Sequence, residues 1–291
     1  MQDNILDREI LSCFNSKIEI ISEKLKAEVL LYTGPIIFDA VPILRDIIEK
    51  CKKENNKQKK LAFILTTLGG SVEATAKIVS IIRHHYSDIS FFVPETAMSA
   101  GTVLCLSGDN ICMDYYSSLG PVDPQVIKGT QFVPALGYLD QFETFIEKSK
   151  KGIISPVEYA MLKDMDLAML KLYEQARNLT IQLIKEWLVR YKFKSWKIHQ
   201  TTQKGKPVTL AEKQERAEKI AQQLNDYKIW LSHGRRIDLD TLVKELKLKI
   251  DNYTNKEEWL LIREYNTAVS TYATRIGKSV FIQSKTGWGA I

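Results

Sequence analysis

Two apolar runs, each followed by a turn of small residues and then by a helical pattern, most constrain how this chain folds. The first run, residues 61–65, ends in Thr-Thr-Leu-Gly-Gly-Ser, and the second, residues 89–93, leads into Ala-Met-Ser-Ala-Gly at positions 97–101. Short runs of β-branched and aromatic residues between turns indicate buried strands. Because strands alternate with helical patterns from residue 28 to residue 115, we predict an α/β fold with a mostly parallel sheet.

Ser99 stands in the second of these turns, at the predicted junction between a strand and a helix. A hydroxyl at such a junction lies beside the first amides of the helix, whose free N–H groups and positive dipole end stabilise a developing oxyanion. Serine is also a common helix cap, so this pentapeptide alone does not separate a nucleophile from a cap. The earlier turn adds to the pattern, because Gly69 and Gly70 allow positive φ and present amide donors without a Cβ in the way.

Three segments together resemble one protein family. TLGGSV at residues 67–72, AMSAGT at 97–102 and SSLGPVDPQ at 117–125 are similar to segments of the serine dehydrogenase proteinases. This family belongs to the ClpP/crotonase superfamily and is related to signal peptide peptidase A. The resemblance implies a ClpP/crotonase-like core of repeated β-β-α and βα units, with an N-terminal helix, in residues 1–190. It also implies a C-terminal helical extension in residues 191–291.

The resemblance also implies roles for individual residues. Ser99 takes the place of the family's nucleophile, and the amides of Gly69, Gly70 and Ala100 take the place of its oxyanion hole. Leu68 departs from the pattern, because relatives usually carry a proline before the two glycines. The loss of that proline makes the turn less rigid but removes no donor.

A serine needs a base to become a nucleophile, and the sequence leaves two candidates open. No histidine follows Ser99 closely, as one does in the ClpP branch. The segment KKGIISP resembles the stretch of signal peptide peptidase A that carries a catalytic lysine, and this match implies that Lys151 is the base. Other lysines nearby are Lys148, Lys150 and Lys163. His233, in a turn between two predicted helices, is the rival base. Asp109, Asp114 and Asp123 could orient a base, although Asp123, which lies between a valine and a proline, is better explained as a turn former.

Composition excludes several classes of protein. Apolar residues make up 45% of the chain and charged residues 26%, as in ordinary globular proteins, and the net charge of +6 is mild. The four cysteines have no C-x-x-C spacing, so neither a zinc site nor a disulfide framework is expected. No pattern indicates a cofactor lysine or a phosphate cup, so we expect no cofactor and no metal. The acidic, amphipathic start and the absence of a membrane-length apolar run favour a cytoplasmic protein without a membrane span.

After residue 155 the pattern is almost wholly helical, with predicted helices at 167–191, 210–225 and 237–249. Basic and aromatic residues mix between 190 and 219, which could form a nucleic-acid surface but more often reflects helix packing, so nucleic acid is an unlikely partner. Residues 279–291 are expected to be a loose tail or an assembly arm.

The sequence thus predicts a serine-type peptidase that acts on peptides or unfolded proteins. The resemblance also implies a homo-oligomer. An alternative is a catalytically inactive, ClpP-like module that binds peptides or proteins. A crotonase-type acyl-CoA enzyme is a third hypothesis, but it needs carboxylates in place of the nucleophile, and the serine at this turn argues against it.

Overall fold

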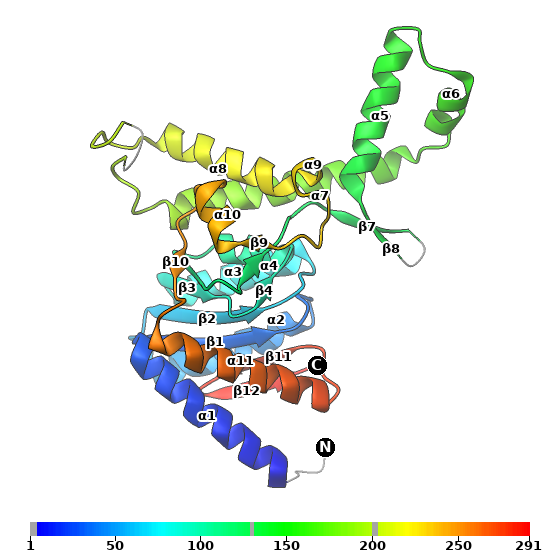
Figure 1. The fold of residues 1–291 in the computed structure, drawn as a ribbon. Helices are drawn as coiled ribbons and strands as arrows, with labels where there is room; N and C mark the ends of the chain where they lie inside the picture. Colours follow the sequence, from blue (N-terminus) through cyan, green and yellow to red (C-terminus); the bar gives the residue numbers. More distant parts are fainter. Residues whose placement is uncertain (1–4, 129–130, 200–202) are drawn as a thin grey trace.

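A seven-stranded sheet forms the centre of the computed structural model, which describes residues 5–128, 131–199 and 203–291 (Figure 1). Its strand order is β10-β5-β3-β2-β1-β11-β12. Strands β1, β2, β3, β5 and β10 run parallel, and β11 and β12 add antiparallel pairs at the β1 edge. The strands are β1 (Glu28–Thr33), β2 (Lys60–Thr66), β3 (Asp88–Phe92), β5 (Asn110–Met113), β10 (Asp251–Asn252), β11 (Phe281–Ser284) and β12 (Gly287–Ala290).

Helices cover both faces of this sheet. Side chains alternate along each strand, so each buried strand places apolar side chains on both faces. In β1, Val29 and Leu31 join one buried cluster, whereas Leu30 and Tyr32 join the other. One face packs against α1 (Ile5–Leu25) and α11 (Glu257–Arg275), which lie side by side in Figure 1. The other face packs against α2 (Ala40–Glu54), α3 (Val72–His85), α4 (Ala100–Leu106), α7 (Leu167–Trp187), the π-helix η1 (Leu188–Lys192) and α8 (Leu210–Asn225).

A second, three-stranded sheet lies at the carboxyl end of the main sheet. It consists of β4 (Thr96–Ala97), β6 (Ser118–Leu119) and β9 (Ile237–Asp238). Between β9 and the preceding α9 (Tyr227–Trp230) the chain makes a turn, and α10 (Leu239–Lys244) follows β9. An isolated bridge between Thr67 and Ala97 connects the two sheets.

A helical arm projects from the body of the molecule (Figure 1). The hairpin of β7 (Gln125–Lys128) and β8 (Gln131–Pro134) leads into α5 (Ala135–Lys150), and α6 (Pro156–Lys163) folds back along it before α7 begins. The C-terminal end of α5 is the end remote from the sheet. We refer to residues 135–173 as the arm.

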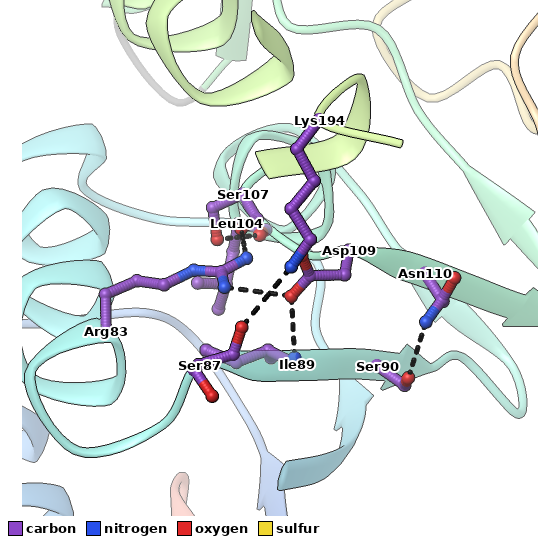
Figure 2. A network of polar contacts seen from close by, with 9 residues as sticks. All are labelled: Arg83, Ser87, Ile89, Ser90, Leu104, Ser107, Asp109, Asn110 and Lys194. Atoms are coloured by element: carbon purple, nitrogen blue, oxygen red, sulfur yellow. Dashed lines mark hydrogen bonds and ion pairs between the residues drawn. The ribbon is translucent and has the colours of Figure 1, made fainter. Parts of the chain in front are cut away.

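A buried ion pair fixes the helix that follows Ser99 (Figure 2). The Arg83 guanidinium donates to Oδ2 of Asp109 at 2.9 Å and also to the carbonyl oxygen of Ser107, just past the end of α4. The same carboxylate oxygen accepts the Ile89 amide at 2.8 Å. The Arg83 guanidinium also stacks on the ring of Tyr191, with 3.7 Å between its central carbon and the ring centroid. The network therefore joins α3, α4, β3 and η1.

The α/β class and the parallel arrangement of the first strands are confirmed by this structure. The interpretation of residues 279–291 as a loose tail is wrong, because they form β11 and β12 of the main sheet. The side chains of Phe281 and Ile282 are fully buried on opposite faces of the main sheet. This burial explains why the segment pairs with β1 as a strand. Residues 191–291 do supply helices, but β9 to β12 also bind this part of the chain to both sheets.

Phe281 offers a direct test of this C-terminal pairing. Its ring stacks on Trp288 with 5.4 Å between centroids and meets Tyr272 edge-on. We expect Phe281→Ala to lower the free energy of unfolding by about 3–5 kcal/mol, since it leaves a cavity in the core. Urea denaturation measures this change. The control is Leu260→Ala on the exposed face of α11, which should lower the free energy of unfolding by less than about 0.5 kcal/mol. Equal and small effects of the two substitutions would indicate a loose tail.

Candidate active site

Ser99 occupies a strained turn between β4 and α4. Its φ is 52° and its ψ is −118°, a conformation that a non-glycine residue adopts at a cost of about 1–3 kcal/mol. The hydroxyl makes no capping hydrogen bond to α4, so the helix-cap interpretation does not apply to this geometry. The side chain is half-buried and therefore reachable from solvent. Such strand-to-helix turns present nucleophilic serines in other hydrolases.

The Gly69–Gly70 turn lies directly against Ser99. At Gly69, φ is 111° and an added Cβ would lie 2.8 Å from the Cβ of Ser99. At Gly70, φ is 145° and an added Cβ would lie 2.2 Å from the carbonyl oxygen of Ile36. Both positions therefore require glycine, for conformation and for space. Leu68, before the glycines, is 81% exposed and leaves the turn intact.

The amides around Ser99 differ in availability. The Gly69 amide donates to Oγ1 of Thr67 at 3.0 Å, so it could serve an oxyanion only if this hydrogen bond opened. Within the ranges that the structure describes, the amides of Gly70 and Ala100 have no protein acceptor. Two N–H groups, one from the glycine turn and one from the residue that follows Ser99, are thus free to bind an oxygen atom.

Thr102 holds the serine turn to the neighbouring loop. Its buried hydroxyl accepts the Gly120 amide at 2.9 Å, and its single proton lies within reach of two carbonyl oxygens, of Ala97 at 2.8 Å and of Gly120 at 2.9 Å. Gly120 also packs on Met98, because an added Cβ would lie 2.4 Å from the methionine methyl carbon. The loop after β6 is therefore fixed beside Ser99.

His233 and Asp123 form a hydrogen-bonded pair. Nδ1 of His233 lies 2.8 Å from Oδ1 of Asp123, and Nε2 of Gln125 donates to the other carboxylate oxygen at 2.6 Å. Asp123 is 1% exposed, whereas the His233 side chain is 24% exposed. Because a carboxylate accepts hydrogen bonds, the paired Nδ1 is the donor, and in a neutral imidazole Nε2 is then the acceptor.

Strand register brings this pair to the same end of the small sheet as Ser99. Ala97 lies beside Leu119, and Leu119 lies beside Ile237 on the antiparallel strand β9. Ser99 lies two residues beyond Ala97, and Asp123 lies four residues beyond Leu119. Because β9 is antiparallel, His233, four residues before Ile237, leaves the sheet at that same end.

Lys151 lies elsewhere in this chain. It caps the C-terminal end of α5, the end of the arm remote from the sheet, and its side chain is exposed (Figure 1). The 16 residues of α5 correspond to a helix about 24 Å long. No contact in the described part of the chain connects Lys151 with Ser99. The other candidate lysines of this region, Lys148, Lys150 and Lys163, also lie on α5 and α6.

Sequence reasoning named His233 and Asp123 as candidates but did not establish contacts that depend on distant parts of the chain. Asp123 and His233 are 110 residues apart, and neither stands in a periodic pattern that predicts their pairing. Thr67 and Thr102 were not singled out, although AGT after Ser99 is part of the motif. No group of three or more His, Cys, Asp or Glu side chains in the described residues is placed to hold a metal ion. Among the same residues, no helix is long and apolar enough to cross a membrane.

Solved structures with a similar fold include two of the 1510-N membrane-bound stomatin-specific protease. An alanine-for-serine variant is 15% identical, with a TM-score of 0.47, and covers 80% of this chain and 82% of that one. An alanine-for-lysine variant in complex with a substrate peptide is 16% identical, with a TM-score of 0.46, and covers 80% and 77%.

Two curated relatives are uncharacterized proteins of Methanocaldococcus jannaschii. One is 33% identical over 144 residues, which cover 46% of this chain and 49% of the relative. The other is 31% identical over 147 residues, which cover 46% and 47%. The chain thus spans about half the length of the curated relatives that it matches.

The family comparison covers more of the chain. Residues 28–206, which include β1, the Gly69–Gly70 turn, Ser99, Asp123 and the arm, match the family of ClpP-like SDH-type serine proteinases. The match extends over more than half of the sequence and agrees with the family that the three short motifs indicated. The chain belongs to the ClpP-like SDH-type serine proteinases.

Proposed function

We propose that this protein is a serine peptidase whose nucleophile is Ser99. The observation that carries this proposal is the position of Ser99 in a strained strand-to-helix turn, between the unoccupied amides of Gly70 and Ala100. Strain of this kind persists only where surrounding contacts hold it, and here Thr102 and Gly69 supply those contacts. Family membership supports the same reaction class.

The reaction uses the groups already described. Oγ of Ser99 attacks the carbonyl carbon of a peptide bond and gives its proton to the base. The carbonyl oxygen becomes an oxyanion and accepts hydrogen bonds from the Gly70 and Ala100 amides. The C–N bond then breaks, the amine takes the proton from the base, and water hydrolyses the acyl-serine.

For the base we favour His233. The buried Asp123 carboxylate fixes the histidine tautomer that leaves Nε2 as a proton acceptor, which is how an aspartate assists a catalytic histidine. Oγ of Ser99 and Nε2 of His233 need to come within about 3 Å, and such contacts often tighten only when substrate binds. Lys151 remains the prediction from resemblance, but it is exposed and follows the end of α5 that is remote from the sheet (Figure 1).

Peptides or unfolded chains as substrates, a cytoplasmic location and assembly into a homo-oligomer belong to the same proposal. The competing function is a peptide-binding module without catalysis. It would keep the turn and the free amides but lack an effective base.

Fluorophosphonate labelling separates these possibilities. Wild-type protein should be labelled and Ser99→Ala should not. We expect His233→Ala and Asp123→Asn to slow labelling at least about 100-fold, since they remove the proton acceptor or its orientation. Lys151→Ala should change the rate by less than about twofold, as for other exposed side chains.

The comparison uses variants that unfold at the same temperature as the wild type, at protein concentrations at which all of them sediment alike. Differences in folding or assembly then do not affect the labelling rates. A large loss with Lys151→Ala and none with His233→Ala would reverse the assignment of the base. Absence of labelling in the wild type would favour the binding module.

The glycine turn gives an independent prediction. Gly69→Ala adds a methyl group against Ser99, and a displacement of about 1 Å at a reacting atom can cost about 100-fold in rate. We therefore expect slower labelling with retained fold. The matched control is Gly137→Ala in α5, where nothing lies within 4 Å of the added carbon. It should stabilise the helix by about 0.5–1 kcal/mol and leave labelling unchanged.

A further inference from the structure

Helix α11 crosses the carboxyl ends of the parallel strands with one hydrogen-bond donor side chain per turn. Trp259, Arg263, Asn266 and Ser270 follow one another at intervals of four, three and four residues, so they share one face of the helix. Each of them contacts the end of a strand or a residue just after it. The contacted residues are Asp114 after β5, Glu95 after β3, Thr66 at the end of β2 and Thr33 at the end of β1.

The two ends of this row fix the helix itself. Nε1 of Trp259 donates to the buried Asp114 carboxylate at 2.7 Å, and the Arg263 guanidinium lies 3.7 Å from the same oxygen atom. At the other end of the row, the hydroxyls of Ser270 and Thr33 lie 3.2 Å apart. Successive turns of one helix therefore follow the strand order β5-β3-β2-β1.

Asn266, in the middle of the row, joins the two segments that lead into the candidate site. Its side chain is fully buried. Oδ1 accepts a hydrogen bond from the Thr66 hydroxyl at 2.9 Å, and Nδ2 donates to the Glu95 carboxylate at 3.1 Å. Thr66 lies three residues before Gly69, and Glu95 lies four residues before Ser99. One carboxamide thus connects the start of the glycine turn with the start of the serine turn.

Backbone hydrogen bonds continue this connection toward the site. The Thr67 amide donates to the Thr96 carbonyl at 2.9 Å, and the Met98 amide donates to the Thr67 carbonyl at 3.0 Å. Helix α11 packs on the face of the main sheet opposite to α4. Asn266 therefore acts on Ser99 through the strand ends and not through the substrate.

We propose that Asn266 is a positioning residue, which sets the distance between Ser99 and the oxyanion-hole amides from the opposite face of the sheet. The inference rests on the proposed role of Ser99 but not on the identity of its base. A carboxamide suits this task, because it accepts one hydrogen bond and donates another in fixed directions. Helix α11 lies outside residues 28–206, so the family match does not include this connection.

An exchange of amide and carboxylate tests the contact. Asn266→Asp keeps the acceptor for Thr66 but places a second carboxylate against Glu95. We expect it to slow fluorophosphonate labelling at least about tenfold, since a displacement of about 1 Å at a reacting atom can cost about 100-fold in rate. Adding Glu95→Gln restores one donor and one acceptor with their sides exchanged, and should return the rate to within about threefold of the wild type. Thr66→Val, which removes the other hydrogen bond, should also slow labelling.

Val269→Ala is the matched control for a loss of stability. Val269 is fully buried on the same helix, but its side chain has no polar atom. The substitution should lower the free energy of unfolding in urea, because it leaves a cavity in the core. Labelling of all variants is measured well below the lowest temperature of unfolding. Under these conditions Val269→Ala should stay within about twofold of the wild-type rate.

Hydrogen exchange gives a readout that does not depend on activity. In Asn266→Asp, the amides of residues 66–71 and 97–102 should exchange at least about fivefold faster than in the wild type, and adding Glu95→Gln should reverse this change. Val269→Ala should not accelerate exchange selectively in these two segments. If Asn266→Asp does not fold, Thr66→Val decides by the same two measurements.

The outcomes separate this inference from the proposed function. Wild-type exchange and labelling rates in Asn266→Asp, or a slow rate that Glu95→Gln does not restore, would overturn the positioning role. A wild type that the fluorophosphonate does not label would contradict the peptidase. Faster exchange of both turns in Asn266→Asp would then still support the connection through Asn266.

Discussion

The backbone pairing at Ala97 is the constraint on which the candidate site depends. Thr67, Ala97, Leu119 and Ile237 lie in neighbouring positions through a bridge and two short strand pairs. Each of these segments ends in a part of the site: the glycine turn, the serine, the aspartate loop and the histidine turn. The candidate site is therefore arranged mainly by strand register, and the hydrogen bond between Asp123 and His233 adds to it.

Strain at the serine is held by buried hydrogen bonds nearby. The left-handed φ of Ser99 costs about 1–3 kcal/mol, and the hydroxyl of Thr102 bonds backbone groups on both sides of the turn. Breaking such a bond would leave a buried carbonyl unsatisfied at a cost of about 1–3 kcal/mol. These hydrogen bonds are thus of the same magnitude as the strain and help to hold the turn. The buried pair of Arg83 and Asp109 supports it from the far end of α4, since it fixes the Ser107 carbonyl.

Local patterns predicted the parts of this molecule that local physics determines. The turns at Gly69 and Ser99, the parallel strands before them and helix α8 follow from periodicity, glycine and capping signals within a few residues. The C-terminal strands were missed because Phe281 and its neighbours pair with a strand some 250 residues earlier, which no window of sequence reveals. The pairing of Asp123 with His233 was undervalued for the same reason, because only the register of β6 and β9 brings them together.

The choice between the two candidate bases depends on where each lies relative to Ser99. Lys151 follows the end of α5 that is remote from the sheet, and its side chain is exposed (Figure 1). His233 leaves the small sheet at the same end as Ser99, and the buried Asp123 carboxylate holds its ring by a hydrogen bond of 2.8 Å. Register within one chain thus favours His233 as the candidate base, because a base has to reach the hydroxyl from which it takes the proton.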